Sequence, residues 1–269
     1  MEIEKKLKEM SEEGYRRFTS GLIPEIPEER ILGVRIPELR KLSRKMEDRK
    51  EFLHSLPHHY LDENNLHAIM ISNIEDQDET IREIERFLPY VDNWETSDIM
   101  NPASLRKDLG KTNSHAHEWL QSRYIYSRRY AITTFMKFFL DIPYLDEMAM
   151  EEISRIGDDD YYVKMASSWY WAEALYRCPG TALTYFEKDQ LDPWIRRKAI
   201  QKARESKKIS KDLKSQLQEM KKGEDQPFLE ISVNIFVYWN IYLSLLISLS
   251  SVFEKFSTSF ALNFFCADT

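Results

Sequence analysis

A short pattern recurs at nearly constant spacing in the middle of this 269-residue chain and limits the folds open to it. A basic residue stands two positions before an alanine in residues 129–131, 164–166 and 197–199, so the basic residues are 35 and 33 positions apart. Such a period, with two helices in each, is the signature of stacked helical repeats, and a small alanine suits close helix packing. We therefore predict an all-α, HEAT-like solenoid whose extended concave groove can cradle a rod such as a duplex.

Composition agrees with a helical protein. The chain has only seven glycines, many helix-forming residues and no run with the alternation of an exposed antiparallel sheet. Two cysteines, Cys178 and Cys266, are too few for a disulfide framework or a metal-binding cluster. The N-terminus lacks the apolar core of a signal peptide, so we expect a reduced, cytoplasmic setting.

Periodicity and helix-ending residues place several helices. Residues 1–20 read as one amphipathic helix, and 60–73 and 77–88 as a helix pair. Pro37 fits the first turn of a further helix, where its missing N–H costs nothing. Pro102 predicts a break after the next helix.

A tryptophan and a carboxylate stand four residues apart at the start of that next helix. Asp92 or Asn93 is a suitable N-cap, and Glu95 lies in the first turn, where its charge suits the helix dipole. Trp94 and Asp98 would then share one helix face. An aromatic plate beside a carboxylate can hold a sugar and stabilise a cation on it. The alternative is a core tryptophan with a capping or solvated aspartate nearby.

Basic residues begin each of the repeated helices. There the helix N-terminus and the side chains would both favour phosphate. They could equally pair with acidic residues of the preceding turn, and the basic side of the helix after Pro37 could be a solvated face. The candidate phosphate-binding residues are Arg40, Arg128, Arg129, Lys164, Arg196 and Arg197.

The remaining tryptophans and the histidines differ in how well they fit a functional site. Small residues before Trp169 leave room beside its ring, whereas Trp171 must face elsewhere, so one of the two is expected in the core. Trp119 and Trp194 have no carboxylate at a useful spacing and are interpreted as structural. The histidines lack Cys or carboxylate partners at ligand spacing and are interpreted as surface or packing residues, so no metal is expected. These histidines are His58, His59 and His67.

Four segments together resemble the AlkD-like DNA alkylation repair proteins, which are HEAT-like repeat alkylpurine DNA glycosylases. They are residues 33–40 (GVRIPELR), 91–98 (VDNWETSD), 128–131 (RRYA) and 164–169 (KMASSW). They occur in the family's order, and the resemblance covers roughly residues 1–220.

The resemblance implies a solenoid that grips duplex DNA in its concave groove. Active members remove N3- and N7-alkylated purines without flipping the lesion into a pocket, unlike most glycosylases. By position, Trp94 and Trp169 would lie against the deoxyribose, and Asp98 would face the anomeric carbon and stabilise oxocarbenium-like charge. Either Arg128 or Arg129 would hold a backbone phosphate. We expect a monomer acting on alkylated duplex DNA.

The implied chemistry needs few groups. An alkylated purine carries positive charge and is a good leaving group, so a general acid is not required. The enzyme mainly has to stabilise positive charge on the sugar through a carboxylate and π-faces, and no metal or organic cofactor is needed.

One departure from the family pattern leaves alternatives open. Active members commonly have Gly-Trp-x-x-Arg-Glu around the second tryptophan, whereas residues 168–173 read SWYWAE, with Ala172 in place of the arginine. A non-catalytic DNA-binding repeat protein that recognises distorted DNA, or a protein-binding helical scaffold, therefore stands beside the glycosylase.

The C-terminal segment differs from the rest, and we expect a repeat domain over 1–222 and an apolar extension over 223–269. Five acidic residues and one lysine give the extension four of the chain's seven net negative charges. The domain itself is therefore only weakly acidic and can still carry basic patches on its surface. Residues 231–253 carry no charge and as a helix would span about 34 Å, enough for a bilayer core of about 30 Å. A membrane anchor, a helix packed on the body and an extension without a role are the three alternatives.

Overall fold

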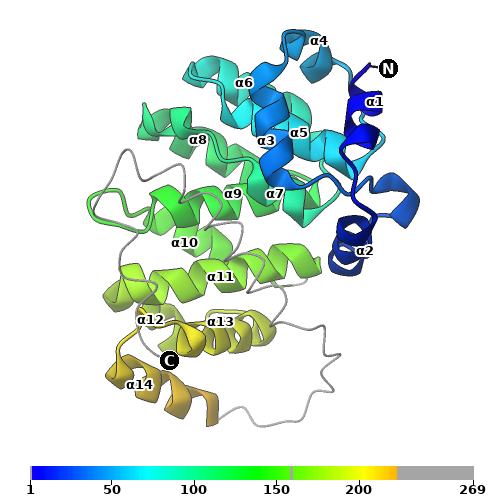
Figure 1. The fold of residues 1–269 in the computed structure, drawn as a ribbon. Helices are drawn as coiled ribbons and strands as arrows, with labels where there is room; N and C mark the ends of the chain where they lie inside the picture. Colours follow the sequence, from blue (N-terminus) through cyan, green and yellow to red (C-terminus); the bar gives the residue numbers. More distant parts are fainter. Residues whose placement is uncertain (1, 158–159, 223–269) are drawn as a thin grey trace. The chain divides into compact units, whose positions relative to one another are not determined.

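The computed structural model of the chain describes residues 2–157 and 160–222, and this part consists of helices and loops without a strand (Figure 1). The α-helices are α1 (Glu2–Glu9), α2 (Glu13–Leu22), α3 (Ile36–Lys45), α4 (Arg49–His54), α5 (Leu61–Ser72), α6 (Gln77–Phe87), α7 (Trp94–Ile99), α8 (Leu109–Leu120), α9 (Ile125–Phe138), α10 (Glu147–Ser154), α11 (Tyr161–Arg177), α12 (Pro179–Glu187), α13 (Pro193–Glu205) and α14 (Lys211–Lys222). Short 3-10 helices are η1 (Glu28–Arg30), η2 (Leu88–Tyr90) and η3 (Ala103–Arg106).

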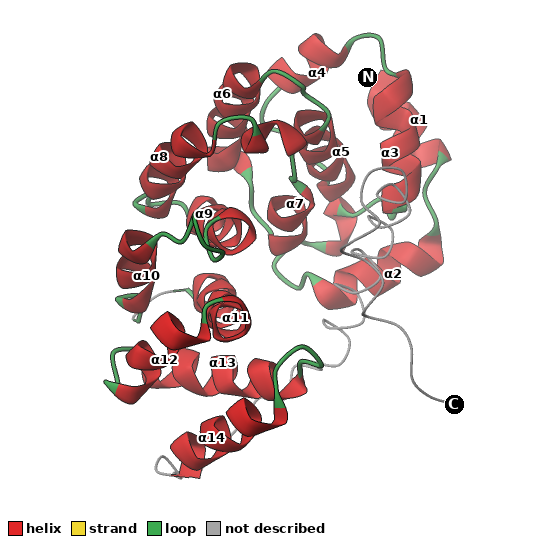
Figure 2. Ribbon diagram, turned by 90° about the vertical axis from the view of Figure 1, so that its left-hand side faces the viewer, coloured by secondary structure: helices red, strands yellow, loops and turns green. Residues whose placement is uncertain are grey.

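Alternate helices form two layers within this part of the chain. Helices α3, α5, α7, α9, α11 and α13 each contact the next one in this order and make the inner layer. Helices α6, α8, α10 and α12 lie side by side in the outer layer (Figure 2). Because each inner helix is followed by an outer one, the chain advances by a two-helix unit. The prediction of an all-α, helical-repeat fold is confirmed.

The alanines of the repeated pattern lie where neighbouring inner helices meet. Ala131 on α9, Ala166 on α11 and Ala199 on α13 are completely buried, and these three helices contact one another in turn. A larger side chain at these positions would push the helices apart, because protein interiors are packed to near-crystalline density. The recurring alanine therefore sets the helix spacing, as predicted.

The N-terminal segment forms two helices, and the prediction of a single helix over residues 1–20 is wrong. Helix α1 ends at Glu9, and the Ser11 hydroxyl donates to the Lys8 carbonyl oxygen beyond it. Glu12 then leaves the helical path, because its N–H donates to the Gly33 carbonyl at 3.0 Å and its carboxylate accepts from Arg35. These contacts depend on a loop about twenty residues away.

That loop is held by a buried carboxylate. Asp62 on α5 accepts hydrogen bonds from the N–H groups of Leu32 at 2.7 Å and Val34 at 2.6 Å. Gly33 between them has φ +84°, and a Cβ there would lie 2.6 Å from the backbone nitrogen of Arg16. Only glycine satisfies both the left-handed backbone and the close approach of α2.

Most other helix predictions are confirmed. Helices α5 and α6 match the pair predicted over 60–73 and 77–88 within two residues. Pro37 lies in the first turn of α3, and α7 ends before Pro102. Trp171 is the buried member of its pair and Trp169 is partly exposed, which agrees with the expectation that one of them is core.

Two of the histidines form a packed pair. The rings of His58 and His67 are buried and hydrogen-bonded at 2.8 Å, and His67 stacks on Phe87 with ring centroids 3.9 Å apart. The packing interpretation therefore holds for these two, while His59 is exposed, in line with a surface residue.

The predicted extension, residues 223–269 with its apolar run 231–253, lies outside the described residues, and the domain boundary at 222 stays a prediction. None of the helices within the described ranges is long and apolar enough to cross a membrane.

The spacing role of the alanines can be tested by enlarging one of them. Ala166→Leu should destabilise the protein by about 1–3 kcal/mol, because the extra atoms overpack the contact of α11 with its neighbours. Ala103→Leu, at an exposed position of η3, should leave the thermal midpoint nearly unchanged. Equal effects of the two substitutions in thermal unfolding would contradict this account.

Candidate active site on the inner helices

The short helix α7 is placed by its first residues. The Asn93 side chain accepts a hydrogen bond from the Thr96 N–H at 2.8 Å and is therefore the N-cap. Asp92, the alternative cap, instead pairs with Arg30 at 2.9 Å. The Asn93 cap starts the helix at Trp94, so Asp98 lies one turn further along α7.

Trp94 is a packed residue. Its side chain is 4% exposed, and its Nε1 donates to the Leu22 carbonyl oxygen at 3.3 Å. The ring thus joins α7 to the end of α2. This burial matches the alternative in which Trp94 belongs to the core, while leaving Asp98 next to the site described below.

Asp98 is held by Arg129 of α9 in a bidentate ion pair. Arg129 Nε lies 2.9 Å from one carboxylate oxygen and Nη2 lies 2.6 Å from the other. The Asp98 side chain is 10% exposed and the Arg129 side chain 2%. Arg129 Nη1 also donates to the Tyr162 carbonyl oxygen at 3.0 Å. Two parallel charge-assisted hydrogen bonds fix the plane of the carboxylate and its position.

Trp169 of α11 extends this group toward α13. The Arg129 guanidinium carbon lies 5.0 Å from the Trp169 ring centroid, and Lys202 Nζ of α13 lies 4.8 Å from it. Both distances are within the range of cation–π attraction. Burial lowers the pKa of Lys202 to about 8, with Lys198 and Arg129 contributing and Glu205 opposing. Asp98, Arg129, Trp169 and Lys202 therefore form one contiguous cluster on successive inner helices.

The two adjacent arginines of α9 point in different directions. Arg129 faces Asp98, whereas Arg128 is partly exposed and lines a surface hollow with residues of α8 and α10 such as Leu120 and Glu152. Neighbouring residues on a helix are about 100° apart, so only one of them can face α7. The structure brings Arg129, not Arg128, to the carboxylate.

The remaining basic candidates have different surroundings. Lys164 pairs with Asp192 at 3.3 Å and lies 5.3 Å from the Trp194 ring centroid. Arg196 is 6% exposed and donates to the Phe186 carbonyl at 3.3 Å, whereas Arg197 is partly exposed. The alternative left open by the sequence, pairing with an acidic residue just before the helix, holds for Arg196, whose Nε lies 3.9 Å from Asp189. Lys164 instead pairs with Asp192, the N-cap of the following inner helix.

Arg40 lies on α3, away from the helices that carry the cluster. Its side chain is partly buried, and burial together with neighbouring Arg44 lowers its pKa.

Glu95, expected in the first turn of α7, is buried beside the cluster. It is 6% exposed and accepts a hydrogen bond from Asn65 of α5 at 3.0 Å. Burial raises its pKa to about 7, and the neighbouring carboxylates of Asp62 and Asp98 raise it too. Its burial could not be predicted, because nothing in the sequence shows that α5 packs against this position.

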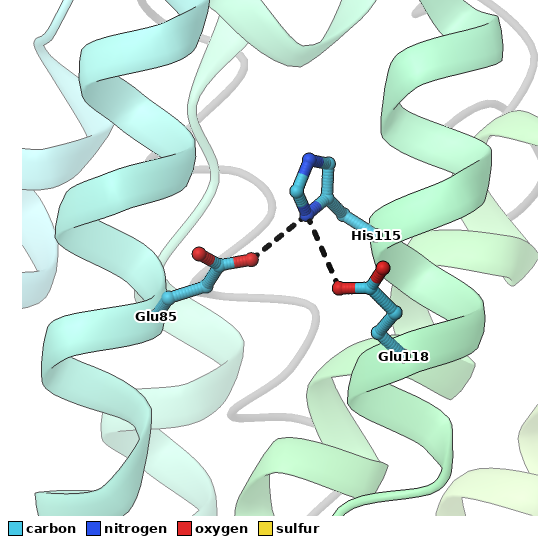
Figure 3. A group of neighbouring side chains, drawn as sticks. All are labelled: Glu85, His115 and Glu118. Atoms are coloured by element: carbon cyan, nitrogen blue, oxygen red, sulfur yellow. Dashed lines mark hydrogen bonds and ion pairs between the residues drawn. The ribbon is translucent and has the colours of Figure 1, made fainter.

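A second cluster joins α6 to α8 (Figure 3). Ligand atoms of Glu85, His115 and Glu118 all lie within 4.8 Å of one another. His115 Nδ1 is 2.8 Å from Glu85 and 3.6 Å from Glu118, and Trp119 Nε1 donates to Glu85 at 3.4 Å. These hydrogen bonds and ion pairs link two outer helices, and we assign the cluster this structural role.

The fold and the cluster define an all-helical repeat protein with a charged and aromatic site along its inner helices. A family model described as "DNA alkylation repair enzyme" matches residues 3–203, well over half of the chain. The chain belongs to this family of DNA-repair enzymes, and the family predicted from the sequence is confirmed. No significant match was found among curated proteins.

The buried Glu95 predicts a pH-dependent contribution to stability. Its folded pKa of about 7 lies above the ordinary 4.5, so the folded state holds this proton more tightly and stability falls as pH rises through that window. Glu95→Gln removes the effect, and its stability relative to wild type should rise by about 3 kcal/mol between pH 5 and pH 8. Urea unfolding at both pH values measures this.

Glu51→Gln, at an exposed position on α4, is the control and should show no such change. A difference between Glu95→Gln and wild type that is the same at both pH values would refute the assignment.

Proposed function

We propose that this protein is a DNA glycosylase that hydrolyses the N-glycosidic bond of N3- and N7-alkylated purines in duplex DNA, without base flipping. The observation that supports it most is the fixed Asp98 carboxylate. It is hydrogen-bonded to Arg129, and Arg129 in turn lies against the partly exposed Trp169. Membership of the family supports a role in DNA repair, whereas the reaction and the substrate are our inference.

In this mechanism Asp98 stabilises the positive charge that develops on the deoxyribose as the base departs. A carboxylate already held in place needs little reorganisation at the transition state, which is the main source of electrostatic catalysis. Trp169 offers a π-face to the same charge, and packed Trp94 fixes α7 against α2. The alkylated base leaves with its own positive charge neutralised, so neither a metal nor an organic cofactor is required.

Arg129 has two roles in the proposal. In the free protein it compensates the charge of Asp98. Arg129 is almost completely buried, so a backbone phosphate approaching the site would act on its guanidinium through charge attraction, in competition with Asp98. Binding of DNA would then leave more of the Asp98 charge for the sugar.

The basic residues around the cluster would hold the DNA backbone. Lys164 and Arg197 are accessible enough to meet phosphates, and Arg40 would do so further along the inner layer. Arg128 faces the hollow beside α8 and α10 and would not contact DNA bound at the cluster. Arg196 is the most buried of the set and would contribute through the position of α13. We propose that the protein acts as a monomer.

Ala172 favours a second candidate function, a non-catalytic protein that binds distorted DNA. The position is one turn beyond Trp169 on α11, where the resemblance leads us to expect an arginine. Lys202 weakens this alternative, because it brings a cation to the Trp169 ring from the neighbouring helix.

Release of 7-methylguanine from methylated duplex DNA tests the glycosylase. Wild type should release the base, and Asp98→Asn should be slower by on the order of 100-fold or more, the cost of losing one preorganised electrostatic group. The amide still accepts a hydrogen bond from Arg129, and thermal unfolding will show whether the variant is folded.

Asp92→Asn is the matched control, because Asp92 lies six residues away and pairs with Arg30 outside the cluster. Its release rate should equal that of wild type. A folded wild type that binds DNA and releases no base would support the non-catalytic alternative, and equal rates for Asp98→Asn and wild type would remove Asp98 from the mechanism.

The phosphate contacts predict salt-dependent DNA binding. Affinity for an undamaged duplex should fall steeply with salt, and Lys164→Gln should weaken binding and reduce the slope of log K against log salt by about 1. Lys188→Gln, at the exposed end of outer helix α12, should change neither quantity. Fluorescence anisotropy measures both. Binding that ignores salt would favour the protein-binding scaffold.

A further inference from the structure

Lys202 is the member of the cluster to which the proposed glycosylase mechanism assigns no chemical step. It lies on α13, is partly buried, and places its amine 4.8 Å from the Trp169 ring centroid. Arg129, which holds Asp98, lies 5.0 Å from the same ring. A sugar lying against Trp169 would therefore be next to this amine as well as to the carboxylate.

The surroundings of Lys202 favour the neutral form of its amine. Burial lowers its pKa to about 8, and the positive charges of Lys198 and Arg129 act in the same direction, while Glu205 opposes them. At neutral pH a larger share of the Lys202 amine is therefore uncharged than in a free lysine. A lysine amine desolvated beside other cations is the usual form of a nucleophile for carbonyl carbon.

We propose that Lys202 is a nucleophile that forms an imine with the aldehyde of an abasic deoxyribose, giving the protein an abasic-site lyase activity. The proposal rests on the proposed function only for the placement of the sugar against Trp169. Its substrate is the product that base release leaves behind, so the two activities would act in sequence at one site.

The reaction balances without a further reactant. The Nζ lone pair attacks C1′ of the ring-opened sugar, the resulting carbinolamine loses water, and a C1′–Nζ imine forms. Water then removes a proton from C2′. The electron pair of the broken C–H bond forms the C2′–C3′ double bond, and the 3′ phosphate leaves. Hydrolysis of the imine returns the amine and an unsaturated aldehyde on the nicked strand.

The test uses a duplex with a preformed abasic site and sodium borohydride, which reduces the imine to a stable amine and joins protein to DNA. Wild type should give a covalent adduct, and peptide mapping should locate it on Lys202. Lys202→Arg, which keeps the positive charge, should lower the adduct yield at least tenfold. Lys202→Gln provides a second variant, and thermal unfolding reports whether each is folded.

Lys137→Arg is the matched control. Burial lowers the pKa of Lys137 to about 8 as well, with the charge of Asp98 opposing, but its amine donates to Asn101 at 3.2 Å and has no contact with the Trp169 ring among the described cation–π pairs. This variant should give the same yield of covalent adduct as wild type. No adduct with wild type, an undiminished adduct with Lys202→Arg, or loss of the adduct in Lys137→Arg would each overturn the proposal.

The abasic site is preformed, so this result does not depend on base release. Trapping without 7-methylguanine release would leave the lyase standing and refute the glycosylase. Release without trapping would refute the lyase alone.

Discussion

The buried ion pair between Asp98 and Arg129 connects three successive inner helices, because the same guanidinium also binds the Tyr162 carbonyl at the start of α11. Removing two charges from water is costly, and the bidentate geometry and the third hydrogen bond offset that cost. Loss of either partner would leave an uncompensated buried charge, worth about 3–5 kcal/mol. The pair thus both holds the repeats together and fixes the carboxylate on which the proposed chemistry depends.

Further cations lie near the pair. Arg129 and Lys202 both lie against Trp169, and Lys164 and Lys198 lie against the Trp194 ring at 5.3 and 6.0 Å. Cations therefore gather on α9, α11 and α13 although the whole chain carries a net charge of −7. Local potential, not net charge, governs where a polyanion can approach a surface. An acidic total is thus compatible with phosphate binding along these helices.

The features that the sequence predicted well have a signal in a short stretch or a regular repeat. The alanine period and the position of Pro37 agree with the structure, and a cap was expected at Asp92 or Asn93, of which the structure shows Asn93. The failures depend on residues distant in the chain. The break after α1 requires Gly33, and the burial of Glu95 requires Asn65 of α5. Neither partner can be inferred from periodicity.

The candidate site divides in the same way. Trp94 and Asp98 were predicted from their helical spacing, and Trp169 from the small residues before it and the family resemblance. The choice between Arg128 and Arg129 depends on the rotation of α9 about its axis. Lys202 had a detectable signal, since it follows Trp194 and Lys198 at intervals of four and so shares their helix face. Spacing alone does not show that Lys202 lies at the Trp169 ring of α11, because that contact joins residues 33 positions apart.

The arrangement also explains why a site of this kind can tolerate its own charges. Before DNA binds, Asp98 compensates the charge of Arg129. Burial and the charges of Lys198 and Arg129 make the protonated form of Lys202 less favourable than in a free lysine. A nearby phosphate would add negative charge that draws Arg129 from Asp98, and departure of that phosphate would reverse this effect. DNA would therefore change how much of the Asp98 charge is available at each step.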